Sequence, residues 1–166
     1  WSSDVCSSDL TRIAIIAGDS EYSVTHERMR GALKALHDAG LQLAGEARFG
    51  PWEAEWGRAA ARLLLNDGAA FDAVICQNDV LARGCIEELE RNGCRVPQDV
   101  AVIGHDNSPD YVSYAHPLLT SIDDNNEMLG RQAALCLLYA IAGRPHHGVE
   151  RVPVKLIQRE STLPLD

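Results

Sequence analysis

Residues 71–107 constrain the fold most, because they contain two apolar strands joined by one helix. The first strand, residues 73–76, shows no polar alternation, as expected when helices cover both faces of a parallel sheet. Asn78 or Asp79 can cap the helix that follows, whose apolar residues recur at helical spacing. The second strand, residues 100–103, is also apolar. The stretch therefore predicts the strand–helix–strand unit of an α/β fold.

The same alternation continues on both sides of this unit. The first hundred residues follow a βαβαβαβ order, which predicts a parallel, Rossmann-like sheet with right-handed crossovers. After Asn107 the pattern changes to a loop or short helix, a strand, a long helix and a last strand. The expected strands are residues 12–17, 41–49, 73–76, 100–103, 118–122 and 152–157; the expected helices are one capped by Ser23 or Thr25 and ended by Gly40, one at 53–65, one from Asp79 to Gly93, and one at 127–142 with N-caps available at 123–125.

Polar residues follow the strands of the central unit where each strand ends. Residues 77–79 follow the first strand, and residues 104–107 follow the second. Open α/β sheets bind ligands in a crevice off the carboxyl ends of their strands. Asn78 and Asp106 are therefore expected at neighbouring places on the binding edge.

The composition limits the classes of function. A chain of 166 residues with 46% hydrophobic content can form one domain with a core. A net charge of −9 argues against this chain itself holding a phosphate backbone, which requires Lys and Arg. No apolar run approaches the roughly 20 residues that a membrane span requires. The five cysteines form no CxxC pair. This absence favours buried free thiols in a reducing cytoplasm over disulfides or a metal site. Four of the cysteines lie in or beside expected strands and helices: Cys76, Cys85, Cys94 and Cys136.

Several groups of residues, in this order and spacing, resemble the lactose/galactose repressor family. They are residues 78–84 (NDVLARG), 96–100 (VPQDV), 104–107 (GHDN), 116–122 (HPLLTSI) and 159–162 (REST). The match runs from about Arg12 to Thr162. The resemblance is to the effector-binding domain of that family, and it implies the type I periplasmic-binding-protein fold.

The resemblance also implies a domain organisation. Residues 11–166 would form the effector-binding domain, mainly its C-terminal subdomain, and residues 123–143 would be a crossover helix of the N-terminal subdomain. On this interpretation the chain is truncated and lacks the helix-turn-helix, the hinge and most of the N-terminal subdomain. Residues 1–10 are rich in Ser and Asp and lack a signal-peptide layout, so they are expected to be a non-native or disordered leader.

Four residues are implied as contacts to the effector: Arg28, Trp52, Asn78 and Asp106. The planar fork of Arg28 suits paired hydroxyls or a carboxylate, and Trp52 suits stacking on a ring. Each has an alternative role: a solvated helix charge for Arg28, packing at the domain edge for Trp52, helix capping for Asn78, and holding a loop through backbone amides for Asp106.

Asp19, His105 and Asp124 form a second set of ligand candidates. His105 stands where the family usually has an aromatic residue, so it is either a polar contact or a packing replacement. One histidine does not make a metal site, and no cofactor is expected. For the dimer interface the resemblance implies Leu81, Tyr111 and Tyr114, although the tyrosines could equally pack within the chain.

The sequence is interpreted as the part of a cytoplasmic transcription regulator that binds a small molecule with the polar groups of a sugar or a nucleoside. In the intact protein we expect a homodimer that contacts DNA only through the missing N-terminal domain. The alternative is the solute-binding component of a sugar transporter with the same fold. An enzyme is a third interpretation, and the sequence has neither a G-x-S-x-G elbow nor a phosphate-binding glycine loop to support it.

Overall fold

The computed structural model describes residues 10–68, 70–145 and 147–162. Apart from Leu10, the leader expected at residues 1–10 lies outside this part of the chain.

One sheet organises the described residues, with strand order β2-β1-β3-β4-β5-β6. Neighbouring strands pair in parallel from β2 to β5, and β6 pairs antiparallel with β5 at one edge. The parallel α/β prediction is therefore confirmed for all strands but the last. The strands are β1 (Ile13–Ala17), β2 (Arg48–Phe49), β3 (Ala73–Cys76), β4 (Ala101–His105), β5 (Thr120–Asp123) and β6 (Lys155–Ile157).

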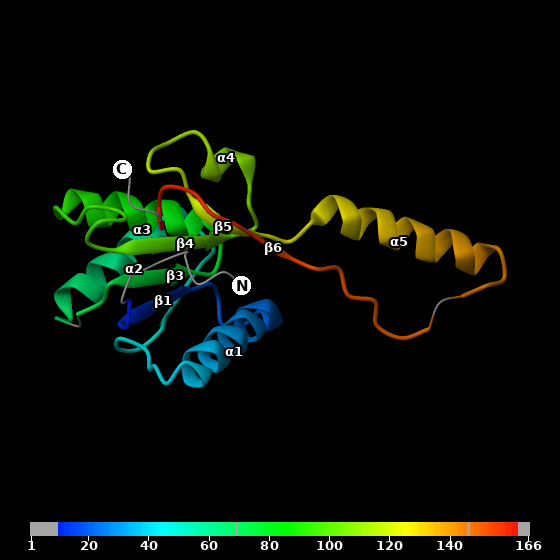
Figure 1. Ribbon diagram of the computed structural model, residues 1–166, viewed down its shortest axis with the longest axis horizontal. Coiled ribbons are helices and arrows are strands. Elements are labelled where there is room, and N and C mark those ends of the chain that lie inside the picture. The colour runs from blue at the N-terminus through cyan, green and yellow to red at the C-terminus, as the bar shows by residue number, and fades with distance from the viewer. Residues whose placement is uncertain (1–9, 69, 146, 163–166) are drawn as a thin grey trace.

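Helices cover the two faces of the sheet unequally (Figure 1). Helices α2 (Ala54–Asn66) and α3 (Asp79–Arg91) pack on the face that carries Ala14 and Ile16 of β1, and with it they form the larger core. Helix α1 (Ser23–Asp38) packs on the opposite face against Ile15 and Ala17, in a smaller cluster. The alternation along β1 places successive side chains on opposite faces, as a strand buried between two helix layers requires.

Two glycines bring α2 and α3 close together. A β-carbon at Gly84 would overlap the backbone oxygen of Ala54 and would lie 2.9 Å from the carbonyl carbon of the same residue. A β-carbon at Gly57 would overlap the backbone oxygen of Leu81. The close packing of these helices therefore depends on the absence of side chains at both positions.

Two local predictions were wrong, and a third, the N-cap of the long helix at 123–125, was confirmed in position only. Strand β2 spans only Arg48–Phe49, not residues 41–49, and Gly45 at φ 88° interrupts the extended chain before it. At the start of α1 the cap position is Tyr22, and Thr25 is instead buried and donates its hydroxyl to the backbone oxygen of Asp19. At the start of α5 the cap position is Asn125, whose side chain makes no capping hydrogen bond.

Helix α5 (Asn126–Ile141) extends away from the sheet beyond β5 and β6 (Figure 1). None of its residues is buried, and its exposed apolar side chains include Leu129, Leu137 and Ile141. Its assignment to another subdomain stays a prediction. Among the described helices, α5 included, none is both long and apolar enough to cross a membrane.

The four described cysteines are free thiols. Cys76 and Cys85 are buried as predicted, but Cys94 and Cys136 are partly exposed, so burial was predicted wrongly for these two. Cys94 follows the turn after α3, and Cys136 lies on α5, where no layer covers the helix.

Candidate functional site

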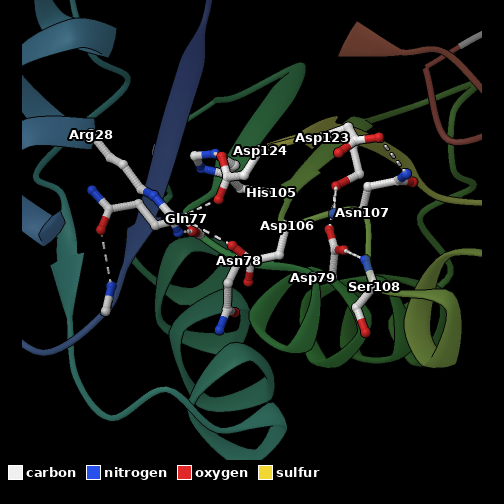
Figure 2. A network of polar contacts seen from close by, with 12 residues as sticks. Arg28, Gln77, Asn78, Asp79, His105, Asp106, Asn107, Ser108, Asp123 and Asp124 are labelled. Carbon is white, nitrogen blue, oxygen red and sulfur yellow. Dashed lines mark hydrogen bonds and ion pairs between the residues drawn. The ribbon is translucent and has the colours of Figure 1, made fainter. Parts of the chain in front are cut away.

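The carboxyl ends of β3, β4 and β5 bring polar side chains together beside α1 (Figure 2). Gln77 and Asn78 follow β3, and Asp124 follows β5. His105 is the last residue of β4, and Asp106 comes directly after it. Parallel pairing in register places these strand ends at one edge of the sheet.

Arg28 of α1 is the centre of this cluster. Its Nη2 donates to Asp106 Oδ1 at 3.0 Å and lies 3.4 Å from Asp124 Oδ2. Its Nη1 donates to the backbone oxygen of Gln77. The side chain is only 20% exposed. A solvated helix charge, the alternative role for Arg28, is therefore wrong; ligand contact stays a prediction.

His105 joins the cluster from the other side. Its Nε2 lies 2.7 Å from Asp124 Oδ1, so Asp124 bridges the imidazole and the guanidinium of Arg28. Ligand atoms of His105, Asp106 and Asp124 lie within 4.8 Å of one another. A divalent cation would nevertheless have to displace Arg28, because its guanidinium already contacts both carboxylates. The arrangement therefore favours an organic ligand with polar groups over a metal ion.

Burial dominates the electrostatics of Asp106. Burial raises the pKa of its carboxyl, and the charge and hydrogen bond of Arg28 oppose that shift. Its backbone has φ 100°, in the left-handed region, and the next residue, Asn107, has φ 51°. Residues other than glycine hold such conformations only when their surroundings enforce them. The direction in which Asp106 points is therefore imposed by contacts elsewhere in the loop.

Gln77 is a site residue that the sequence analysis missed. Its amide accepts from the backbone N–H of Gly18 at 3.2 Å and donates to the backbone oxygen of Thr25 at 3.0 Å. The side chain is buried, and these two hydrogen bonds link the end of β1 to α1. The backbone oxygen of Gln77 accepts a hydrogen bond from Arg28. A buried polar side chain directly after an apolar strand was the available sign of this role.

Asn78 caps α3, as one of its two predicted roles requires. Its side-chain oxygen accepts from the backbone N–H of Leu81 at 2.8 Å, and the residue is buried. Contact of Asn78 with a ligand stays a prediction.

Trp52 and Asp19 lie outside the Arg28 cluster. A β-carbon at Gly18 would overlap the indole ring of Trp52, so the ring packs directly on the backbone at the end of β1. Asp19 accepts from the backbone N–H of Glu21 at 2.9 Å and closes the turn before α1. Packing therefore describes the observed contacts of Trp52, and turn formation those of Asp19.

A cavity of about 310 Å³ adjoins the cluster between α1 and the sheet. Arg28, Gln77 and His105 reach its wall, which is otherwise made of apolar or small residues, among them one isoleucine from each of four strands: Ile15, Ile75, Ile103 and Ile122. The apolar wall can contact the apolar part of a ligand. Hydroxyl groups of the ligand would therefore find hydrogen-bond partners only at the end of the cavity formed by the Arg28 cluster.

The residues predicted for a dimer interface differ in exposure. Leu81 of α3 is fully buried in the larger core, so its side chain cannot reach a second subunit, and this prediction was wrong. Tyr111 is half-buried, and its carbonyl accepts from Arg83 Nε. Tyr114 is 71% exposed. An interface role stays a prediction for the two tyrosines.

Comparisons with known proteins connect this geometry to a family. The sequence profile of a family described as periplasmic binding protein-like domain matches residues 6–162. The transcriptional regulator CelR of Thermobifida fusca is 35% identical over 152 residues, which cover 90% of this chain and 44% of CelR.

Solved structures agree with the sequence comparison. The lac repressor dimer bound to operator and the anti-inducer ONPF is similar with a TM-score of 0.86 and 30% identity, covering 93% of this chain and 46% of the repressor. A complex of CelR with cellobiose has a TM-score of 0.81 and 34% identity, covering 92% of this chain and 47% of that protein. The chain thus spans somewhat less than half the length of each of these proteins.

Proposed function

The chain belongs to the periplasmic binding protein-like domain family, in its lactose/galactose repressor group, and we propose that it is the effector-binding part of a bacterial transcription regulator. The effector would be a small polar molecule of the sugar or nucleoside type. The relatives are regulators, which favours this function over a transport receptor or an enzyme.

The Arg28 cluster is the observation that supports an effector site. A guanidinium shared between two carboxylates, with a histidine beside them, presents donors and acceptors within a few ångströms at the edge of the sheet. Adjacent sugar hydroxyls both donate and accept, so they can insert between such groups and replace their mutual contacts. Because these side chains are half-buried, contacts with a ligand are less screened there than at an open surface.

The rest of the regulator would surround this part. The exposed apolar side chains of α5 support its proposed role as a crossover helix that packs in the N-terminal subdomain. Tyr114 would lie in a homodimer interface, and DNA would be contacted by a domain outside this chain. The protein would act in the cytoplasm.

The test is a ligand-induced thermal shift of the full-length protein. Hexoses, cellobiose, lactose and adenosine serve as probes, and the shift with any probe that binds is compared between wild type and Asp106→Ala. Loss of one charge-assisted contact weakens binding on the order of tenfold or more, which removes most of the shift at moderate ligand concentration. Asp38→Ala, which removes an exposed carboxylate near the end of α1, is the matched control. A shift of wild-type size in Asp106→Ala would exclude Asp106 from the site.

A further inference from the structure

The carboxylate of Asp79 is buried but makes its hydrogen bonds to neutral donors. The residue is 1% exposed and lies in the first turn of α3. Its Oδ1 accepts from the hydroxyl of Ser121 at 2.6 Å, and its Oδ2 accepts from the backbone N–H of Ser108 at 2.7 Å. Burial raises the pKa of its carboxyl, because the charged form is less well solvated there than in water. Such a group calls for a role beyond capping, which Asn78 already performs.

The contacts of Asp79 lead directly to the loop after β4. While the hydroxyl of Ser121 donates to Asp79, its oxygen accepts from the backbone N–H of Asn107 at 3.0 Å. The amides of two successive residues, Asn107 and Ser108, are thus held by one carboxylate, the first through a hydroxyl and the second directly. Figure 2 shows Asp79 beside Ser108 and Asn107, on the side of the loop away from Arg28.

These two amides follow the residue whose conformation most needs support. Asp106 and Asn107 have φ values of 100° and 51°. Such conformations are unfavourable for residues other than glycine unless their surroundings compensate. Fixing the N–H groups of Asn107 and Ser108 fixes the peptide planes that define this turn. The same turn directs the carboxylate of Asp106 to Arg28, at 3.0 Å.

Gly104 shows that the strand is shaped to admit this carboxylate. A β-carbon at Gly104 would overlap Asp79 Oδ1 and would lie 3.0 Å from Leu119 Cδ2. Any larger residue at this position of β4 would push Asp79 away from Ser121. A glycine inside a strand commonly marks such a close approach.

We propose that Asp79 is a positioning residue of the effector site, whose buried carboxylate holds residues 106–108 so that Asp106 faces Arg28 before any ligand arrives. The role rests on the proposed function for the ligand itself, but the preorganised loop is a property of the free protein. Preorganised groups bind more tightly because the ordering cost is met during folding.

Two substitutions, each by a residue close in size to the original, test the loop in the absence of ligand. Asp79→Asn keeps the shape of the side chain but replaces one acceptor by a donor, and Ser121→Ala removes the bridging hydroxyl while leaving Asp79. Two-dimensional ¹H–¹⁵N NMR of the full chain should show shifted amide resonances of Asn107 and Ser108 in Asp79→Asn. Exchange of the Ser108 amide with solvent should be roughly tenfold faster or more, because a hydrogen bond to a charged group is lost.

The control is Asp99→Asn, which removes a surface carboxylate paired with Arg95. It should leave the resonances of residues 106–108 in place. Unchanged resonances and exchange at Asn107 and Ser108 in both Asp79→Asn and Ser121→Ala would overturn the proposal, even if both variants had lower denaturation midpoints, since that pattern is a structural role alone.

Ligand binding then separates this proposal from the proposed function. Whichever probe among cellobiose, lactose and adenosine binds the full-length protein should bind Asp79→Asn at least about tenfold more weakly. Altered loop resonances with unchanged affinity would refute the positioning role while the effector site stands. If no probe bound wild type, the proposed function would lose support, and the NMR result would still decide whether Asp79 holds the loop.

Discussion

Replacing Gly84 by alanine should destabilise the protein although alanine is the better helix former. Gly84 lies in α3 where α2 crosses it, and the new methyl group would overlap the backbone oxygen of Ala54. It would also lie 3.0 Å from the backbone nitrogen of Arg58. Backbone atoms of a helix cannot rotate aside as a flexible side chain can, so the two helices must separate.

The magnitude of the destabilisation follows from two unfavourable terms and one favourable term. Overpacking of a filled core typically costs about 1–3 kcal/mol, and a clash with rigid backbone belongs at the upper end. A gap of about 0.5–1 Å between the helices would forfeit a quarter to a half of the dispersion contacts that line it. Helix propensity returns about 1 kcal/mol in favour of alanine. The net loss is about 2 kcal/mol, which corresponds to a fall in melting temperature of roughly 4–8 °C for a chain of this size.

Gly31→Ala provides the matched control. This glycine lies within α1, and a β-carbon there meets nothing within 4 Å. The same chemical change should therefore stabilise the protein by about 0.5–1 kcal/mol. Urea denaturation followed by far-ultraviolet circular dichroism measures both variants. A Gly84→Ala protein as stable as wild type would refute the argument that α2 and α3 are in backbone contact.

Two further predictions concern titratable groups. Glu160 accepts from the backbone N–H of Leu118 and from His116, and both contacts lower the pKa of its carboxyl. The contribution of Glu160 to the free energy of unfolding is therefore present above its unfolded pKa of about 4.3 and is lost as the pH falls through the lower folded pKa. Urea midpoints of Glu160→Gln should consequently depend less steeply on pH below about 5 than those of wild type. Burial raises the pKa of the Cys76 thiol, whereas Cys94 is partly exposed. Maleimide labelling of the native protein, read by peptide mass spectrometry, should therefore modify Cys76 at about one tenth of the rate of Cys94 or more slowly still. Equal rates would contradict the burial.

Most of the fold could be predicted because the apolar pattern of this chain changes period clearly. The strands at 73–76 and 101–105 are largely buried, and apolar runs of this length between polar turns are typical of strands, because helices usually need about ten residues or more. The expected strand at 41–49 failed because Gly45 at positive φ breaks it, and sequence alone does not reveal which of several glycines adopts that conformation.

Some members of the Arg28 cluster could be predicted, but their contacts could not. Strand ends located Asn78 and Asp106, and the family resemblance located Arg28, but nothing in the sequence indicates that Arg28 binds Asp106 and Asp124 together. Asp79 was interpreted as a helix cap, because its partners lie 29 and 42 residues later in the chain. Contacts over such separations depend on the registers of β4 and β5, which the local pattern does not fix.

The attachment of α5 has a mechanical consequence. The helix is 16 residues long, about 24 Å, and it joins the sheet through Asn125 in the left-handed conformation and, on its return, through β6. A rotation of about 10° at Asn125 would displace the far end of the helix by about 4 Å. Asp124, the residue next to this pivot, is held by Arg28 and His105. Any molecule that altered those two contacts would therefore act next to the pivot, and the resulting displacement would be largest at the far end of α5.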